Sequence, residues 1–340
     1  MRPQFSALTI ARAPRRDIRL VITTGLVDRV IVIPRNGYAN RLQAWASAQL
    51  LAGQVGAPLR VLWEPESVAT SPAESLFSTD LIGEQFVSTD EVTSLLGMPH
   101  AHFPRYLTHH ADRDVIVLAG HDRGEETFMR ELGRLLTGLS QPTTLVIIAG
   151  GLFHLPGSSD AEAGRRSFYR QLRWSARLDN LVDSMEGGRP PFAALHVRQT
   201  DRSLQAPTER EMRRGLSRLS ALIPERSLLI CADTEAARVQ WAAISRDLGF
   251  DSWSIEGVEF DRGSVDNGIF ALLDWRLLSS ASGVVHAAAS TFSTEAVIAG
   301  GVAATSVPLQ AGMLIKTRRR VRSAVESIVT YPARRRALGT

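Results

Sequence analysis

The residues best suited to chemistry form the segment 196–202 (HVRQTDR), which ends and follows an apolar run at residues 192–197. In an α/β sheet, the carboxyl ends of the strands are where ligands bind. The planar guanidinium of Arg198 could bind two oxygens of a diphosphate at once and keeps its charge at any useful pH. A loop of ordinary surface charges is the alternative interpretation. Three neighbours are further candidate catalytic residues: His196, Asp201 and Arg202.

A second candidate segment is the loop 34–41 (PRNGYANR), which joins an apolar run to a helical pattern. Backbone N–H groups at the start of a helix form an anion site, and the helix dipole strengthens it. The loop has one glycine and no Gly-Lys-Ser/Thr, so it is neither a Walker A loop nor a GxGxxG fingerprint. The expected donor-binding residues are Asn36, Gly37, Asn40 and Arg41, with Asn40 also expected to cap the helix.

Two more segments place nucleotide-binding side chains at strand ends. Asp233 follows the run 228–231, where its carboxylate could accept hydrogen bonds from a base or ribose, or cap the next helix. The segment 286–295 (HAAASTFSTE) leads through small residues to hydroxyls at a helix start, which suits a phosphate. A helix cap by Ser293 is the alternative. The candidate donor-binding residues here are Thr291, Ser293 and Thr294.

The elements that must position these segments alternate between apolar runs and helical patterns. We expect strands at 30–33, 59–63, 115–119, 145–149, 192–197, 228–231 and 283–286. We expect helices at 40–51, 208–222, 235–248, 267–278 and 294–300. The stretch 66–110 is predicted to be irregular and 158–190 to carry one amphipathic helical pattern. This alternation predicts an α/β fold with parallel sheets covered by helices.

The length of 340 residues favours two domains. The turn cluster 187–191 (GGRPP) separates two strand–helix series and marks the expected boundary. We therefore predict two Rossmann-like domains that face each other across a cleft. They would cover residues 21–188 and 189–330, with a variable lead-in at 1–20 and a basic tail at 331–340.

Composition excludes some classes of protein. The single cysteine, Cys231, excludes an internal disulfide and a zinc site of several thiolates. The net charge of +4 rests on arginine, since Lys316 is the only lysine, and it suits either a solvated surface or a polyanion such as a nucleotide diphosphate. No run of 18 apolar residues occurs, and the N-terminus makes a poor signal peptide. We expect a cytoplasmic protein with no transmembrane segment and no nucleic-acid partner, and leave its oligomeric state open.

Taken in order, these segments resemble the fucosyltransferase superfamily. The motifs are PRxGxxNRL at 34–42, HVRxTD at 196–201, the Asp after the next strand, ALLDWxLLS at 271–279 and STFSxxA at 290–296. Bacterial relatives of the nodulation α-1,6-fucosyltransferases and the protein O-fucosyltransferases share this order. The segments 62–65 (LWEP) and 74–77 (ESLF) also resemble the bacterial branch. The likeness covers roughly residues 30–77 and 192–300.

The resemblance implies a GT-B-like fold and an inverting glycosyltransferase. The donor would be a GDP-sugar, usually GDP-fucose, used as co-substrate without a metal or other cofactor, and the acceptor a glycan or another hydroxyl. Arg198 matches the arginine that grips the donor diphosphate, and Arg41 and Arg202 would support it. Residues 189–330 would bind the donor and 21–188 would face the acceptor. The other matches are Asn40 and Arg41 at the cleft, Asp233 near the nucleoside, and Ser293 and Thr294 near the phosphates.

This sequence departs from the α-1,6 pattern at three places. Gln199 stands where a second Arg is usual, Arg202 where Lys is usual, and Ala39 in a loop that is usually richer in glycine. Three alternatives therefore stay open. They are a GT-B glycosyltransferase with another nucleotide-sugar donor, an inactive sugar-nucleotide-binding protein, and a metal-dependent GT-A enzyme built on Asp112 and Asp114.

Overall fold

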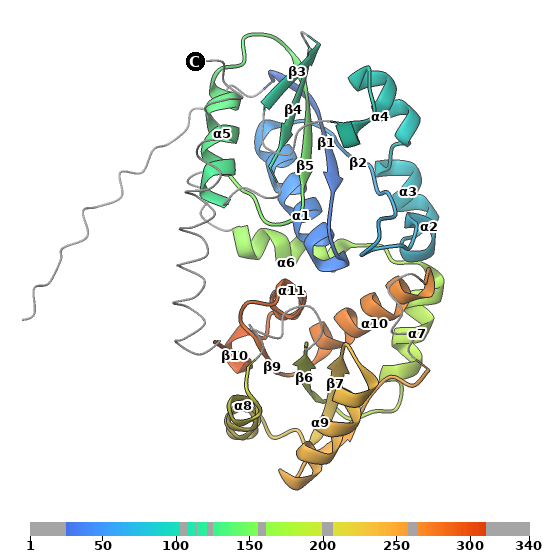
Figure 1. Ribbon diagram of the computed structural model, residues 1–340, viewed down its shortest axis with the longest axis vertical. Helices are drawn as coiled ribbons and strands as arrows, with labels where there is room; N and C mark the ends of the chain where they lie inside the picture. The colour runs from blue at the N-terminus through green and yellow to red at the C-terminus, as the bar shows by residue number, and fades with distance from the viewer. Residues whose placement is uncertain are drawn as a thin grey trace, which may run out of the picture.

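The computed structural model describes residues 25–102, 108–112, 114–120, 125–155, 161–198, 207–257 and 264–310. Two five-stranded sheets follow one another along the chain (Figure 1). Of the strand pairs that the structure describes, all but one are parallel, and helices cover the sheets. The α/β fold class is therefore confirmed. Asp201, Arg202, the lead-in at 1–20 and the tail at 331–340 lie outside the described residues.

The first sheet has the strand order β2-β1-β5-β4-β3, and only β3 is antiparallel to its neighbour. Its central strands are apolar and almost wholly buried, as expected of a parallel sheet that is covered on both faces. Helix α1 begins beyond the carboxyl end of β1 and packs back against that strand. The elements are β1 (Val27–Pro34), α1 (Tyr38–Val55), β2 (Leu59–Val61), β3 (Thr108–Asp112), β4 (Val115–Ala119), α5 (Glu125–Thr137) and β5 (Thr143–Ala149).

The second sheet has the order β10-β9-β6-β7-β8 and is parallel throughout. Numbered from its first strand, this is the order 5-4-1-2-3 of a Rossmann half, so the strand order reverses between β6 and β9. Such a reversal is where α/β sheets bind ligands. The elements are β6 (Ala193–Val197), α8 (Glu209–Leu222), β7 (Ser227–Ala232), α9 (Glu235–Asp247), β8 (Asp251–Trp253), α10 (Asp266–Ser280), β9 (Val284–Ala287), α11 (Thr291–Gly300) and β10 (Val307–Leu309).

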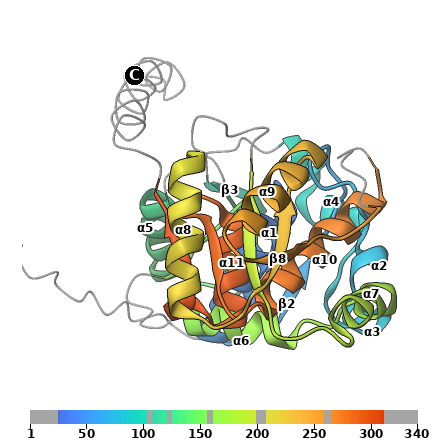
Figure 2. The same cartoon turned by 90° about the horizontal axis from the view of Figure 1, so that it is seen from below.

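Alternate residues of β6 enter two different cores. Leu195 and Val197 pack in a core with α8 and α9, on the face away from the first sheet (Figures 1 and 2). Ala194 joins the opposite core, which contains α10 and α11 and continues into α1 and β1. Helices α6 (Ala161–Gln171) and α7 (Ala176–Glu186) complete this layer between the sheets. The two sheets thus share one continuous apolar core.

The stretch 66–110 is not irregular, which corrects the prediction from sequence. It contains α2 (Ala73–Leu76), α3 (Thr79–Gln85), α4 (Thr89–Leu96) and a 3₁₀ turn (His100–His102). Ser78 and Ser88 accept hydrogen bonds from backbone amides at the starts of α3 and α4. Serines and threonines suggest a loop in the sequence, but here they cap short helices.

Two other helix predictions need correction. The pattern 158–190 is broken into α6 and α7, because Ser175 caps a new helix and Trp174 forms a bridge with Phe77. Helix α1 begins at Tyr38 with Gly37 as its N-cap, so Asn40 lies in the first turn and is not the cap. Of the helices that the structure describes, none combines the length and apolar character needed to cross a bilayer.

Candidate functional site

The carboxyl ends of β6 and β9 bring two buried histidines together at the reversal of strand order. His196 is the buried penultimate residue of β6, and its ring stacks on Phe292, with centroids 5.3 Å apart. Burial, His286 and Arg198 lower the pKa of His196 to about 3, and Asp233 offsets part of this. His196 is therefore neutral at neutral pH. Sequence-predicted residues from β6, β7 and the loop before α11 thus lie near one another.

The start of α11 contains buried hydroxyls that lack partners. Among the residues that the structure describes, Ser290 Oγ, Ser293 Oγ and Thr294 Oγ1 have no hydrogen-bond partner, and neither has His196 Nδ1. Buried polar atoms are usually paired, and an unpaired one costs about 1–3 kcal/mol. Oxygens of a bound anion would satisfy these hydroxyls, and the positive end of the helix dipole would favour its charge.

The structure settles the two capping alternatives. Ser293 is not the cap of α11, because the helix begins at Thr291 after Ser290 and the Ser293 side chain lies buried inside the first turn. Asp233 is not the cap of α9, because Thr234 accepts the amide hydrogen of Ala237 at 3.2 Å. Neither side chain is therefore needed to begin its helix.

Asp274 is a candidate site residue that the sequence analysis quoted only as part of a motif. Its backbone carbonyl lies 4.0 Å from Cys231 Sγ on β7. Burial raises the pKa of Asp274 to about 7, although Arg238 and Cys231 act against the shift. Its Oδ1 has no hydrogen-bond partner among the described residues. The signal in the sequence was an acidic residue inside a mostly apolar helical segment, ALLDWRLL.

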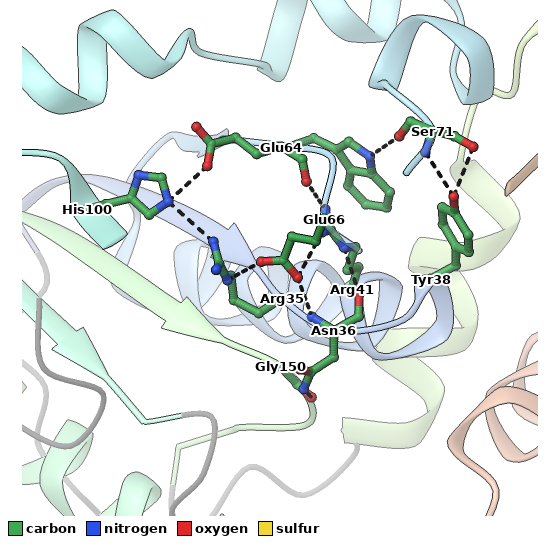
Figure 3. Close-up of polar contacts among 10 residues, drawn as sticks. Arg35, Asn36, Tyr38, Arg41, Glu64, Glu66, Ser71, His100 and Gly150 are labelled. Atoms are coloured by element: carbon green, nitrogen blue, oxygen red, sulfur yellow. Dashed lines mark hydrogen bonds and ion pairs between the residues drawn. The ribbon is translucent and has the colours of Figure 1, made fainter. Parts of the chain in front are cut away.

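The loop before α1 is held by hydrogen bonds and ion pairs to the segment after β2 (Figure 3). Arg41 is fully buried and donates from Nε to the carbonyl of Asn36 at 2.8 Å and from NH1 to the carbonyl of Glu64 at 2.6 Å. Its NH2 lies 3.1 Å from Glu66 Oε2, and Glu66 also pairs with Arg35. Burial lowers the pKa of Arg41, and Glu66 opposes this shift. These contacts tie the loop to the segment after β2 and give both of its arginines a shared counter-charge.

The backbone of this loop is shaped by the same contacts. Asn36 has a φ of 70°, its amide donates to Glu66 Oε2 at 3.1 Å, and its side chain donates to the carbonyl of Gly150 at 3.2 Å. The side chains of Asn36 and Arg41 are thus engaged within the protein. A ligand would meet mainly the backbone N–H groups at the start of α1. The donor-binding roles of Asn36, Gly37, Asn40 and Arg41 stay predictions.

Three residues that sequence reasoning missed surround the loop: Glu64, Glu66 and His100. His100 Nε2 lies 2.9 Å from Glu64 Oε2 and 3.4 Å from Arg35 NH1. Burial lowers the pKa of His100, and the Glu64 carboxylate opposes this shift. The available signal was the pair of acids in WEPE, at 63–66, directly after a strand.

The start of α1 also touches the start of α10. The Tyr38 hydroxyl bonds Ser71 Oγ at 2.9 Å, and Ser71 Oγ donates to the carbonyl of Val265. Thr70 donates to the carbonyl of Ser264 at 2.7 Å. A Cβ on Gly268 would overlap Ser71 Oγ and the Tyr38 hydroxyl, so this helical position requires glycine. These contacts join the first half of the chain to the second near the candidate site.

A cavity of about 580 Å³ lies elsewhere, beside the carboxyl ends of α10 and α11. Its lining includes Trp174, Arg276, Ser280 and Ala299. The candidate site is at the opposite end of α11, where the helix begins. The cavity is therefore separate from the residues that carry the chemistry. The residues that the structure describes contain no group of three or more His, Cys, Asp or Glu side chains placed to hold a metal.

Comparison with known proteins identifies the fold. No protein-family model matches the chain, and no characterised protein matches it in sequence. The solved structure of NodZ α-1,6-fucosyltransferase soaked with GDP-fucose does match its fold, with a TM-score of 0.55 and 20% identity over 80% of this chain and 92% of that one. Fucosyltransferase NodZ from Bradyrhizobium gives a TM-score of 0.52 and 19% identity, over 79% and 92%.

A plant protein shows the same likeness. A variant of FUT1 from Arabidopsis thaliana in complex with GDP gives a TM-score of 0.56 and 17% identity, covering 81% of this chain and 69% of that chain. This chain therefore has the fold of the fucosyltransferases. The resemblance inferred from the order of its motifs is confirmed at the level of the fold.

Proposed function

We propose that this chain is an inverting glycosyltransferase that moves a sugar, fucose from GDP-fucose, to a hydroxyl of a glycan or another acceptor. The observation that carries the proposal is the group of unpaired buried hydroxyls at the start of α11, beside the reversal of strand order. That group suits the phosphates of a nucleotide sugar. The fold supports the same donor, since the similar NodZ and FUT1 structures were solved with GDP-fucose and GDP.

The chemistry is a single displacement at the sugar C1, and negative charge grows on the leaving diphosphate. Fixed donors placed where this charge develops stabilise the transition state, each by about 3–4 kcal/mol. Arg198, the residue after β6, is the proposed diphosphate contact, and Arg202 is a second. The N–H groups at the start of α11 add to this field. Asp201 and His196 are the candidates for the acceptor base. A pKa of about 3 makes His196 a weak base, which favours Asp201 as the base and leaves His196 to orient its neighbours.

The two sheets would be the cores of two Rossmann-like domains that face each other across a cleft. Residues 189–330 would bind the donor, and residues 21–188 would form the acceptor side. No metal is needed in this scheme, because arginine and helix N–H groups take the role that a cation has in metal-dependent enzymes.

A thermal-shift screen tests the proposal. GDP and GDP-fucose are expected to raise the melting temperature in the presence of EDTA, with UDP and CDP much less effective. Ligand at 100 times its Kd adds about 2.7 kcal/mol to stability. A shift with UDP and none with GDP would move the assignment to another nucleotide sugar. GDP binding without hydrolysis or transfer would identify an inactive binding protein, and a strict need for Mg²⁺ or Mn²⁺ would favour a metal-dependent enzyme.

A further inference from the structure

A buried carboxylate joins three helices behind the candidate site. Glu295, in the second turn of α11, has 1% of its surface exposed. Its Oε1 accepts a hydrogen bond from Gln43 Nε2 of α1 at 2.7 Å. Its Oε2 accepts from Arg165 Nε at 2.9 Å and from the Tyr169 hydroxyl at 2.7 Å, both on α6. One side chain therefore links α1, α6 and α11.

Stability alone does not account for this cluster. Removing a carboxylate and a guanidinium from water is costly, and well-packed apolar side chains at such places are often as stable or more so. Arg165 is itself buried, so the charges compensate each other but gain little overall. A carboxylate also has the wrong sign for a place so near a proposed phosphate site. What directional hydrogen bonds do supply, and apolar packing does not, is a fixed relative geometry.

The bond from Gln43 to Glu295 lies directly behind the two candidate loops. Gln43 is five residues after Tyr38, where α1 begins, and Glu295 is four residues after Thr291, where α11 begins. At 1.5 Å per residue, both side chains start about 6–8 Å behind their helix ends. Any change at this bond therefore shifts one loop relative to the other.

We propose that Glu295 is a positioning residue that sets how the start of α11 faces the start of α1. Gln43 makes the link between the two helices, and Arg165 with Tyr169 orients the carboxylate. This inference rests on the proposed function in one respect: the donor held at α11 must meet groups of the first half for transfer to occur. The donor phosphates themselves are expected to bind mainly at the second half of the chain.

The variant Gln43→Met removes the link and keeps the length of the side chain. We expect kcat for donor hydrolysis or transfer to fall about tenfold, while Kd for GDP stays within twofold and the melting temperature within a few degrees. Gln54→Met, at an exposed position of the same helix, is the matched control and is expected to behave as wild type. Combining Gln43→Met with Glu295→Gln is expected to lower kcat no further than the worse single variant. Additive losses, or a kcat that follows only the fraction folded, would overturn the proposal.

A second readout needs no activity. Spin labels on Arg130→Cys of α5 and Val239→Cys of α9 report the distance between the two halves, because the native Cys231 is buried. We expect Gln43→Met to broaden or shift this distance, and an unchanged distribution would contradict the proposal. If wild type turns over no nucleotide sugar, the proposed function fails, but the label distances still decide the role of Glu295.

Discussion

The two strand–loop–helix segments of the candidate site satisfy their polar groups in opposite ways. At the start of α1, the cations Arg35 and Arg41 both pair with Glu66, which lies in the segment after β2. At the start of α11, the hydroxyls of Ser293 and Thr294 are buried and lack partners among the described residues. The first segment has completed its own contacts, whereas the second has unmet hydrogen-bonding capacity. The donor phosphates are therefore expected at the second segment, and any contact of the donor with the first segment is expected from its backbone N–H groups.

The largest effect is expected at Arg198. Arg198→Lys keeps the positive charge but loses the planar guanidinium that can bind two oxygens at once. Both Arg198→Lys and Arg198→Ala are therefore expected to lower turnover by about a hundredfold or more. The melting temperature should barely change, because Arg198 is only half-buried at the end of β6. Rates of GDP-fucose hydrolysis, GDP affinity and melting curves of both variants test this. An Arg198→Ala protein that binds GDP normally but melts many degrees lower would make Arg198 a structural ion-pair partner.

Glu66→Gln tests the first segment. It leaves the buried guanidinium of Arg41 without its counter-charge, which costs about 3–5 kcal/mol, or a melting temperature lower by roughly 10 °C. GDP affinity is expected to stay within twofold of wild type when measured below the melting transition. Glu74→Gln, an exposed acid in the same half, is the control and should change neither quantity. A large loss of GDP affinity with normal stability would show that the first segment contacts the donor directly.

The pH dependence of stability tests Asp274, the desolvated acid of α10 that lies against β7. Asp274 has a pKa of about 7 in the folded protein, above its ordinary value of 3.8. Between these values the folded state holds the proton more tightly, so the stabilising contribution is complete below pH 3.8 and is lost as the pH rises through 7. Asp274→Asn removes the titration. As the pH rises from 5 to 8, the variant is expected to gain about 3 kcal/mol of stability relative to wild type, measured by chemical denaturation. If the difference in stability between the variant and wild type did not vary with pH, the raised pKa of Asp274 would be contradicted.

The sequence predicted the strand ends well because apolar runs mark buried strands, and the motif residues sit where these runs stop. It predicted less well wherever a polar residue is buried. Glu295 looks like an ordinary exposed helix residue in STFSTEA, yet its partner Gln43 is 252 positions away. Glu66 likewise looks like a surface acid until Arg41 is seen beneath it. Such pairings depend on contacts between distant segments, which periodicity and spacing do not encode.

The smallest effect is expected from a comparison of two buried serines, one whose hydroxyl lacks a hydrogen-bond partner and one whose hydroxyl has partners. Ser293 Oγ is buried without a described partner, whereas Ser306 Oγ donates to the carbonyl of Val302 at 2.8 Å and accepts the amide of Val284 at 3.1 Å. Ser293→Ala is expected to weaken GDP binding about fivefold to tenfold, the value of about 1 kcal/mol for one hydrogen bond, and to leave the melting temperature unchanged or higher.

Ser306→Ala is the matched control and is expected to do the reverse. It leaves the buried amide of Val284 without its hydrogen-bond acceptor, so stability should fall by about 1–3 kcal/mol while GDP affinity stays at the wild-type value. Calorimetric titration with GDP and melting curves of the two variants make the comparison directly. Equal losses of stability in both variants would mean that Ser293 has a structural partner after all. The contrast between the two segments would then no longer place the donor at α11.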